Sequence, residues 1–196
     1  MQARSRCLFK TSCSEMEDFM EINTGLVHIY HGDGKGKTTC ATGLAVRCAG
    51  GGGKVLFYQF LKNGSSGELN VLKNVSNITV MEGYDKVKFS YLMTEEESKE
   101  TTEYYSKKLR EISEKISEGD YQLLILDEVL HAVNKGYIEL QAMLDFIKNK
   151  PEKLEVVLTG RDPKEELLEV ADYVTEMKKI KHPFDRGIAS RHLIED

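Results

Sequence analysis

The sequence predicts an α/β domain in which helices cover both faces of a mostly parallel sheet. Three observations lead to this expectation. Short apolar runs alternate with longer amphipathic stretches along the chain, which is the pattern of strand–helix–strand crossovers. A glycine-rich loop follows the first apolar run. The 196 residues are 40% hydrophobic and 30% charged, an ordinary balance for one globular domain with its own core.

The first half of the chain contains three expected strands and one clear helix. Residues 26–30 form the first strand, and residues 37–49 form a helix that ends at four consecutive glycines. Residues 54–60 and 78–81 are the next two expected strands. The glycine-rich loop therefore joins a strand to a helix.

A long helix is the clearest element of the second half. Thr94 is the expected N-cap, and Glu97 completes a capping box. An apolar stripe with spacings of four, three and four residues carries this helix to about residue 118. Residues 121–126 form the most apolar expected strand, and we therefore expect this strand near the centre of the sheet.

The remaining elements follow the same alternation. Residues 136–149 are expected to be helical, and residues 155–158 form a strand. A turn over residues 160–163 opens a helix that reaches about residue 170. Residues 173–177 are the last expected strand.

Charge and composition exclude several classes of partner. The net charge of −5 disfavours sequence-independent binding to nucleic acid or to anionic lipid, because both need a basic surface. The longest aliphatic run, residues 123–126, is too short to span a bilayer. Four cysteines without a C-x-x-C pair indicate reduced thiols rather than a disulfide framework. We therefore expect a cytoplasmic protein.

The first residues differ from the rest of the chain. The start is basic and contains serines, as in an organelle transit peptide, but it is short and acids begin at Glu15. We expect residues 1–24 to be a mobile N-terminal extension and residues 25–196 to form the domain.

The strongest functional signal is the loop Gly32-Asp33-Gly34-Lys35-Gly36-Lys37-Thr38-Thr39. Its glycines let backbone N–H groups turn towards an anion, and the following helix N-terminus adds partial positive charge. Lys37 supplies a cation, and the Thr38 hydroxyl can ligate Mg²⁺. The usual G-x-x-x-x-G-K-[ST] spacing requires a glycine at His31, so the pattern is displaced by one residue. The strand before it and the helix after it still predict a P-loop NTPase-like (RecA-like) fold.

An acidic pair completes the expected nucleotide site. Asp127 and Glu128 directly follow the most apolar strand. Asp127 would hold Mg²⁺ (or Mn²⁺) directly or through water, with Glu128 beside it. An acidic pair after a strand is weak evidence alone, but together with the loop it predicts binding of a magnesium nucleotide. The reaction remains open at this point, because this fold carries many chemistries.

Longer stretches of the sequence form a more specific pattern. They are the loop itself, Gly43-Leu44-Ala45-x-Arg47-x-Ala49-Gly50, Gln59-Phe60-x-Lys62, Gly67-Glu68, Leu124-Ile125-Leu126-Asp127-Glu128, Leu158-Thr159-Gly160-Arg161, Ala171-Asp172-x-Val174-Thr175-Glu176-Met177 and Lys181-His182-Pro183-Phe184-Asp185-x-Gly187. With these stretches, in the same order over about residues 25–195, the chain resembles the P-loop type of ATP:corrinoid adenosyltransferases. Lys35 before Gly36-Lys37, and the Lys-His-Pro-Phe tail, separate this family from ordinary kinases.

The resemblance implies an unusual reaction. The Co(I) centre of a corrinoid attacks the 5′ carbon of ATP, and the whole triphosphate leaves, which gives adenosylcobalamin or an adenosylated precursor. Lys35, Lys37, the loop N–H groups and Mg²⁺ would stabilise the charge that the leaving group gains. Co(I) carries no proton, so no general base is required. The resemblance also implies a flavoprotein reductant and a homodimer whose N-terminal segment covers the neighbouring active site.

The resemblance also assigns residues. Gly32, Asp33, Gly34, Lys35, Gly36, Lys37, Thr38, Thr39 and Arg47 would bind ATP. Lys37, Thr38 and Glu128 would be catalytic, with Thr38, Asp127 and Glu128 at the metal. Phe89, Tyr91 and His182 would contact the corrinoid, with Tyr84 as a competing aromatic. Asp33 stands where relatives often carry Asn, and a carboxylate beside phosphates is unfavourable unless it caps the loop or faces Mg²⁺.

Two other functions use the same loop. A small-molecule kinase or NTPase would place the γ-phosphate at the reacting point and would release ADP. A nucleotide-binding switch protein would bind ATP or ADP tightly and turn over slowly. Neither function requires the Lys-His-Pro-Phe tail.

Overall fold

The computed structural model describes residues 24–88 and 90–195. Within them, six strands form a single sheet in which all neighbouring strands are parallel. In chain order, the strands are β1 (Val27–His31), β2 (Val55–Gln59), β3 (Ile78–Val80), β4 (Leu123–Asp127), β5 (Glu155–Thr159) and β6 (Tyr173–Glu176). Their order across the sheet is β3-β2-β4-β5-β1-β6, so β4 lies in the interior, as its apolar sequence predicts.

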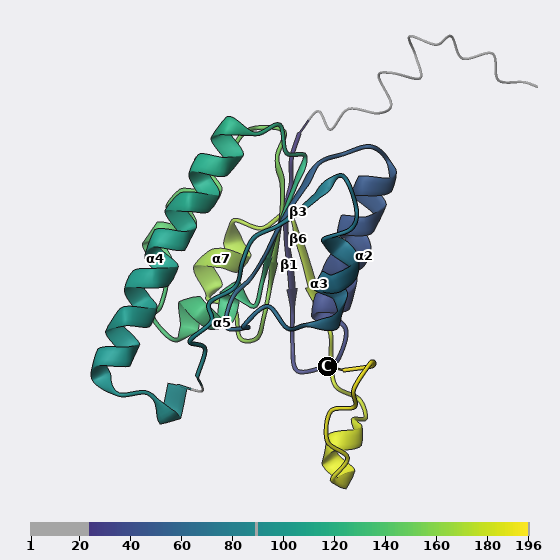
Figure 1. Cartoon of the computed structure of the whole chain (residues 1–196), viewed down its shortest axis with the longest axis vertical. Helices are drawn as coiled ribbons and strands as arrows, with labels where there is room; N and C mark the ends of the chain where they lie inside the picture. Colours follow the sequence, from purple (N-terminus) through teal and green to yellow (C-terminus); the bar gives the residue numbers. More distant parts are fainter. Residues whose placement is uncertain (1–23, 89, 196) are drawn as a thin grey trace, which may run out of the picture.

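Helices cover both faces of the sheet. The helices are α2 (Lys37–Gly50), α3 (Gly67–Leu72), α4 (Glu95–Glu118), α5 (Val129–Asn134), α6 (Leu140–Lys148) and α7 (Glu165–Glu169), with 3₁₀ turns at Ser90–Leu92 and Pro183–Arg186. In Figure 1, α2 and α3 lie on one side of the sheet, and α4, α5 and α7 lie on the other. The predicted P-loop NTPase-like, RecA-like class is therefore confirmed.

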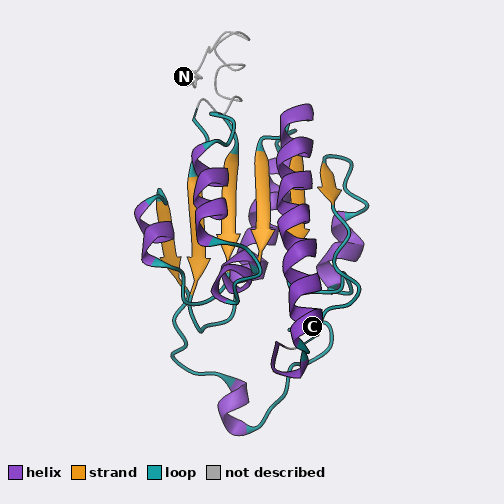
Figure 2. Cartoon of the chain, turned by 90° about the vertical axis from the view of Figure 1, so that its left-hand side faces the viewer, coloured by secondary structure: helices purple, strands orange, loops and turns teal. Residues whose placement is uncertain are grey.

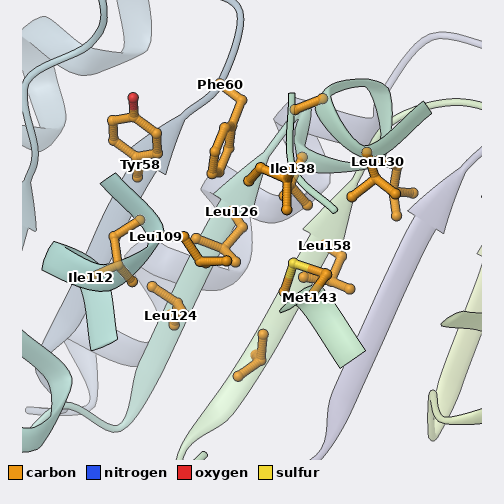
Figure 3. Packing of buried hydrophobic residues seen from close by; sticks show 14 of the residues in the cluster. Tyr58, Phe60, Leu109, Ile112, Leu124, Leu126, Leu130, Ile138, Met143 and Leu158 are labelled. Carbon is orange, nitrogen blue, oxygen red and sulfur yellow. The ribbon is translucent and has the colours of Figure 1, made fainter. Parts of the chain in front are cut away.

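The inner strands β2, β4 and β5 are buried on both sides because helices cover both faces of the sheet, whereas the residues of the edge strand β6 are exposed. In β4, Leu124 and Leu126 pack with the side chains of α4, whereas Leu123 and Ile125 pack with those of α2. Figure 3 shows the larger core, in which Tyr58 and Phe60 lie at the end of the cluster beside Leu109 and Leu126. Each fully buried aliphatic side chain stabilises the fold by about 1.5–3 kcal/mol, which is why these runs are nearly unbroken.

Helix α4 follows its sequence signals closely. The Thr94 side chain accepts a hydrogen bond from the Glu97 N–H, and the Glu97 carboxylate accepts one from the Thr94 N–H. The capping box is therefore confirmed, and the helix ends at Glu118 as expected. No helix in the described part of the chain is long and apolar enough to cross a membrane.

The predicted helix over residues 136–149 is wrong in its first turn. Gly136 has a φ of 73°, which ends the preceding turn, and α6 begins only at Leu140. The short helices α3 and α5 were not predicted. Each has six residues, which is too short for an apolar period to stand out from its flanks.

All six strands end at the same edge of the sheet, where the functional residues gather. In Figure 2 every strand arrow points towards this edge, and the segment after β6 extends beyond it. Three non-glycine residues just after strands at this edge have positive φ: Leu61 after β2, Glu128 after β4 and Asp162 after β5. Such backbone costs of order 1 kcal/mol or more per residue and concentrates at functional sites.

Candidate active site

The glycine-rich loop joins β1 to α2 at the carboxyl edge, as predicted. The Gly34 N–H donates to the Met177 carbonyl over 2.6 Å, so the loop is tied to the segment that follows β6. A Cβ atom on Gly34 would lie 2.5 Å from that carbonyl oxygen, and one on Gly32 would lie 2.6 Å from it. Only glycine fits at these two positions, because this backbone approaches so closely.

Lys37 lies inside this loop rather than projecting from it. Its ammonium donates to the carbonyl of Gly32 over 2.8 Å and to that of Gly34 over 2.9 Å. The side chain is only 9% exposed. Burial lowers the pKa of Lys37, while the negative charges of Glu128 and Asp127 partly oppose this effect. The loop therefore holds a cation at its centre.

Asp127 connects residues of the site that come from several different elements. It is fully buried at the end of β4, and each carboxylate oxygen accepts two hydrogen bonds. Oδ1 accepts from the hydroxyls of Thr38 at 2.9 Å and Thr159 at 2.7 Å. Oδ2 accepts from the Gln59 amide at 3.1 Å and from the Lys62 ammonium at 2.9 Å. The predicted partners Thr38 and Asp127 are thus in direct contact.

Glu128 follows with a left-handed backbone at φ 60°, so its direction differs from that of a continuing strand. Its N–H donates to the Thr159 hydroxyl, and its carboxylate contacts His131 Nδ1 at 3.4 Å. Burial raises the pKa of Glu128, but the bond to His131 and the positive charges of Lys62 and Lys37 outweigh it and leave the pKa below its usual value. Glu128 is therefore held as an anion beside Asp127.

Asp33 contacts the tail of its own chain. Its Oδ1 accepts a hydrogen bond from the Lys179 N–H over 2.9 Å, and this bond lowers the pKa of Asp33. Beyond Lys179 the tail folds back, so that His182 and Phe184 line a cavity of about 350 Å³ with Lys37. Asp33, Gly34, Lys35 and Arg161 also line that cavity. The structure thus brings His182 to the loop through the tail.

The other predicted residues are more dispersed. Thr39 is exposed and lines a separate cavity of about 1020 Å³ with Thr38 and Lys62. Arg47 is exposed in the last turn of α2, ten residues and therefore about 15 Å along the helix from Lys37. Tyr91 is 78% exposed in the 3₁₀ turn before α4. Phe89 lies outside the described residues. The roles of these residues remain predictions.

Sequence reasoning assigned no role to Gln59, Lys62 and Thr159, which contact Asp127 directly. The register explains two of them, because Gln59 is paired with Asp127 across β2 and β4, and Thr159 ends the strand on the other side. A polar residue that ends an apolar strand is the signal that could have identified them. The order of the strands in the sheet, which cannot be read directly from the sequence, decides which strand ends lie next to Asp127.

The donor set around Asp127 suits a hard divalent cation. A hydroxyl oxygen of Thr38 and a carboxylate of Asp127 lie side by side, and Mg²⁺ prefers oxygen ligands. Within residues 24–88 and 90–195 no group of three His, Cys, Asp or Glu side chains could hold a metal. An ion here would therefore take further oxygens from a bound phosphate or from water, which is the usual coordination of Mg²⁺ at nucleotide sites.

Comparison with known proteins decides which family this site belongs to. The family model described as ATP:corrinoid adenosyltransferase BtuR/CobO/CobP matches residues 23–195. The chain belongs to this family. A corrinoid adenosyltransferase from Sinorhizobium sp is 33% identical over 87% of this chain and 80% of that protein. The one from Pseudomonas aeruginosa is 31% identical over 87% and 83%, and the one from Escherichia coli K12 is 28% identical over 85% and 83%.

Membership of the ATP:corrinoid adenosyltransferase family confirms the resemblance inferred from the motifs. The match spans the loop, the acidic pair and the tail, so all three segments lie within the region that the family model covers. ATP and a corrinoid are the two substrates that fit this family.

Proposed function

We propose that this protein transfers the 5′-deoxyadenosyl group of Mg-ATP to the Co(I) centre of a corrinoid and releases triphosphate. The observation that carries the proposal is the loop with Lys37 at its centre, joined through Thr38 to the buried Asp127, in a chain of the adenosyltransferase family. This arrangement suits a polyphosphate that leaves as a unit.

The reaction balances with one bond formed and one broken. The cobalt electron pair forms a bond to the 5′ carbon, and the bond between that carbon and the triphosphate oxygen breaks. The leaving triphosphate keeps the electrons of that bond, and cobalt is formally oxidised from Co(I) to Co(III). No proton is lost by the nucleophile, so the protein has to position the substrates and stabilise charge.

The residues of the loop would carry that stabilisation. Lys37 and the loop N–H groups would bind the triphosphate, and Lys35 would add a second cation at the cavity. Thr38 and Asp127, with Glu128 beside them, would hold Mg²⁺ or Mn²⁺. When bound, the metal would supply Lewis-acid stabilisation of the phosphate oxygens.

On the corrinoid side, the aromatic residues differ in exposure. Tyr84 is 5% exposed and stacks on Tyr104, with ring centroids 4.2 Å apart. Tyr91 is largely exposed and precedes α4. This contrast favours Tyr91 over Tyr84 as an aromatic contact for the corrin ring, with His182 approaching from the tail. The proposed role of Phe89 rests on the family resemblance alone, because Phe89 lies outside the described residues.

We also propose the setting in which this reaction occurs. Co(I) is readily oxidised, so a flavoprotein reductant would supply it. The protein would act as a cytoplasmic homodimer, and residues 1–24 would cover the active site of the neighbouring subunit.

An anaerobic assay with Mg-ATP and chemically reduced cobalamin tests the proposed reaction. We expect a light-sensitive cobalt–carbon product, followed by absorbance, together with an equal amount of triphosphate. Formation of ADP without any corrinoid change would instead support a kinase or NTPase. Nucleotide binding with neither product would support a switch protein.

A further inference from the structure

Lys62 is a charged residue at the centre of the site that the proposed reaction does not yet use. It follows β2 by three residues, after the left-handed backbone of Leu61, whose N–H donates to the Tyr105 hydroxyl. This turn directs the Lys62 ammonium to Asp127 Oδ2 at 2.9 Å. The fold thus holds an unfavourable backbone conformation at the point where Lys62 reaches the buried carboxylate.

Within the described part of the chain, Asp127 accepts hydrogen bonds from four side chains, and Lys62 is the positively charged donor among them. The other three are the hydroxyls of Thr38 and Thr159 and the amide of Gln59. Lys37 is engaged with the carbonyls of Gly32 and Gly34 instead. A fully buried carboxylate is strongly disfavoured without a compensating charge, and Lys62 supplies that charge.

A divalent cation at Thr38 and Asp127 would occupy the same environment. It would bring positive charge to a carboxylate whose oxygens already accept four hydrogen bonds. Two cations a few ångströms apart in a poorly hydrated site repel each other. A divalent ion bound here would therefore compete with the Lys62 ammonium for Asp127.

If a metal displaced the Lys62 side chain from Asp127, that side chain could move into an adjacent cavity. Its side chain is 29% exposed and lines the cavity of about 1020 Å³ that Thr38 and Thr39 also line. This cavity opens beside Thr38 and Thr39 at the N-terminus of α2, next to the loop that would bind the proposed triphosphate. An ammonium on a flexible stem suits such a movement.

We infer that Lys62 is an exchangeable counter-charge, which neutralises Asp127 before the metal arrives and binds the triphosphate once the metal has displaced it. This inference rests on the proposed function, because it takes the loop to bind a metal-triphosphate. It assigns Lys62 a positioning role towards the metal and a direct binding role towards the phosphates.

The test measures two ligands separately on the full-length protein. Mn²⁺ alone is titrated into the nucleotide-free protein and followed by electron paramagnetic resonance, and inorganic triphosphate is titrated by calorimetry with Mg²⁺ present. For Lys62→Met we expect Mn²⁺ to bind about tenfold tighter and triphosphate about tenfold more weakly. Lys62→Arg keeps the charge and should stay near the parent in both titrations.

A matched control is Lys108→Met, which removes another half-buried lysine, paired with Glu111 on α4. It should change neither titration. A purely structural role for Lys62 would weaken both ligands together, so opposite changes are the signature of exchange. Mn²⁺ binding that stays equal or weakens in Lys62→Met overturns the inference, as does unchanged triphosphate binding.

Thermal unfolding of Lys62→Met with and without Mg²⁺ separates misfolding from exchange. The variant should gain more stability from Mg²⁺ than the parent, because the metal replaces the missing charge. An equal or smaller gain contradicts the inference. Failure of the proposed function would look different, with normal Mn²⁺ and triphosphate binding but no adenosyl transfer by the parent protein.

Discussion

Lys37 is a charged side chain that is largely buried in the loop. Its two carbonyl partners belong to the loop itself, so the ammonium and the loop backbone support each other. Replacing Lys37 with Met removes the cation while keeping most of the side-chain volume. We expect the rate of adenosyl transfer to fall at least about a hundredfold, the usual effect of losing one charge-stabilising donor.

The rate of the cobalt–carbon product measures this effect, with Lys148→Met as a control at the surface-exposed end of α6. The control should retain the parent rate. A Lys37→Met protein that folds and keeps more than about a tenth of the parent rate would contradict the charge-stabilising role of Lys37.

The contribution of Glu128 to stability should depend on pH, because its folded-state pKa lies below the ordinary value of 4.5. Ionised Glu128 therefore contributes stability above the unfolded-state pKa, and this contribution is lost as the pH falls through the folded-state pKa. We expect Glu128→Gln to be less stable than the parent near neutral pH. The difference should shrink on acidification.

Urea unfolding at several values between about pH 3 and pH 7 measures the Glu128 contribution. Glu103→Gln, at an exposed position of α4, is the matched control and should show no such trend. A stability difference between parent and Glu128→Gln that stays constant across this range would refute the assignment.

At the level of single residues, the sequence predicts the members of the site that lie in a local pattern. Lys37 and Thr38 follow from the loop, and Asp127 follows from its apolar strand. The polar end of an apolar strand marks Thr159 as a candidate, but the contacts of Thr159 and Lys62 with Asp127 could not be predicted. They depend on which strands are neighbours and on the left-handed backbone of Leu61. Neither property is visible in a single stretch of sequence.

Among the elements, the tail after β6 depends on the loop for its position. Asp33→Ala removes the acceptor of the Lys179 N–H, whereas Asp33→Asn keeps an oxygen in the same place. We expect the Lys179 amide to exchange with solvent several-fold faster in Asp33→Ala, because its N–H loses its acceptor. The Asn variant should stay near the parent.

Amide hydrogen exchange followed by mass spectrometry measures this difference. Trypsin cleavage after Lys178 and Lys179 gives a second measurement of the same segment. Equal protection of the tail in the Ala and Asn variants would show that the side chain of Asp33 does not hold it.

The helices show what limits prediction at the level of elements. Helix α4 is 24 residues long with a complete capping box, and it agrees with the predicted N-cap at Thr94 and the predicted end at about residue 118. Helix α5 begins directly after Glu128, where the chain leaves β4 without any glycine or proline. Only Asp127 and Glu128 separate the apolar residues of β4 from those of α5, and six residues are too few for a helical period to stand out.

For the whole molecule, the core and the site share one strand. Leu126 is fully buried in the larger core and directly precedes Asp127. We expect Leu126→Ala to lower the free energy of unfolding by about 2–5 kcal/mol, because it leaves a cavity between β4 and its covering helices. Urea unfolding measures this loss. Val71→Ala, at a position 66% exposed on α3, should stay within about 0.5 kcal/mol of the parent.

The four partners of Asp127 come from α2, from β2 and the loop after it, and from β5. These segments are far apart in the sequence and meet only when the parallel crossovers are complete. During synthesis on the ribosome, a chain that has not yet released Thr159 cannot assemble the full set. We therefore expect the complete set of Asp127 partners to form only late in the synthesis of the chain.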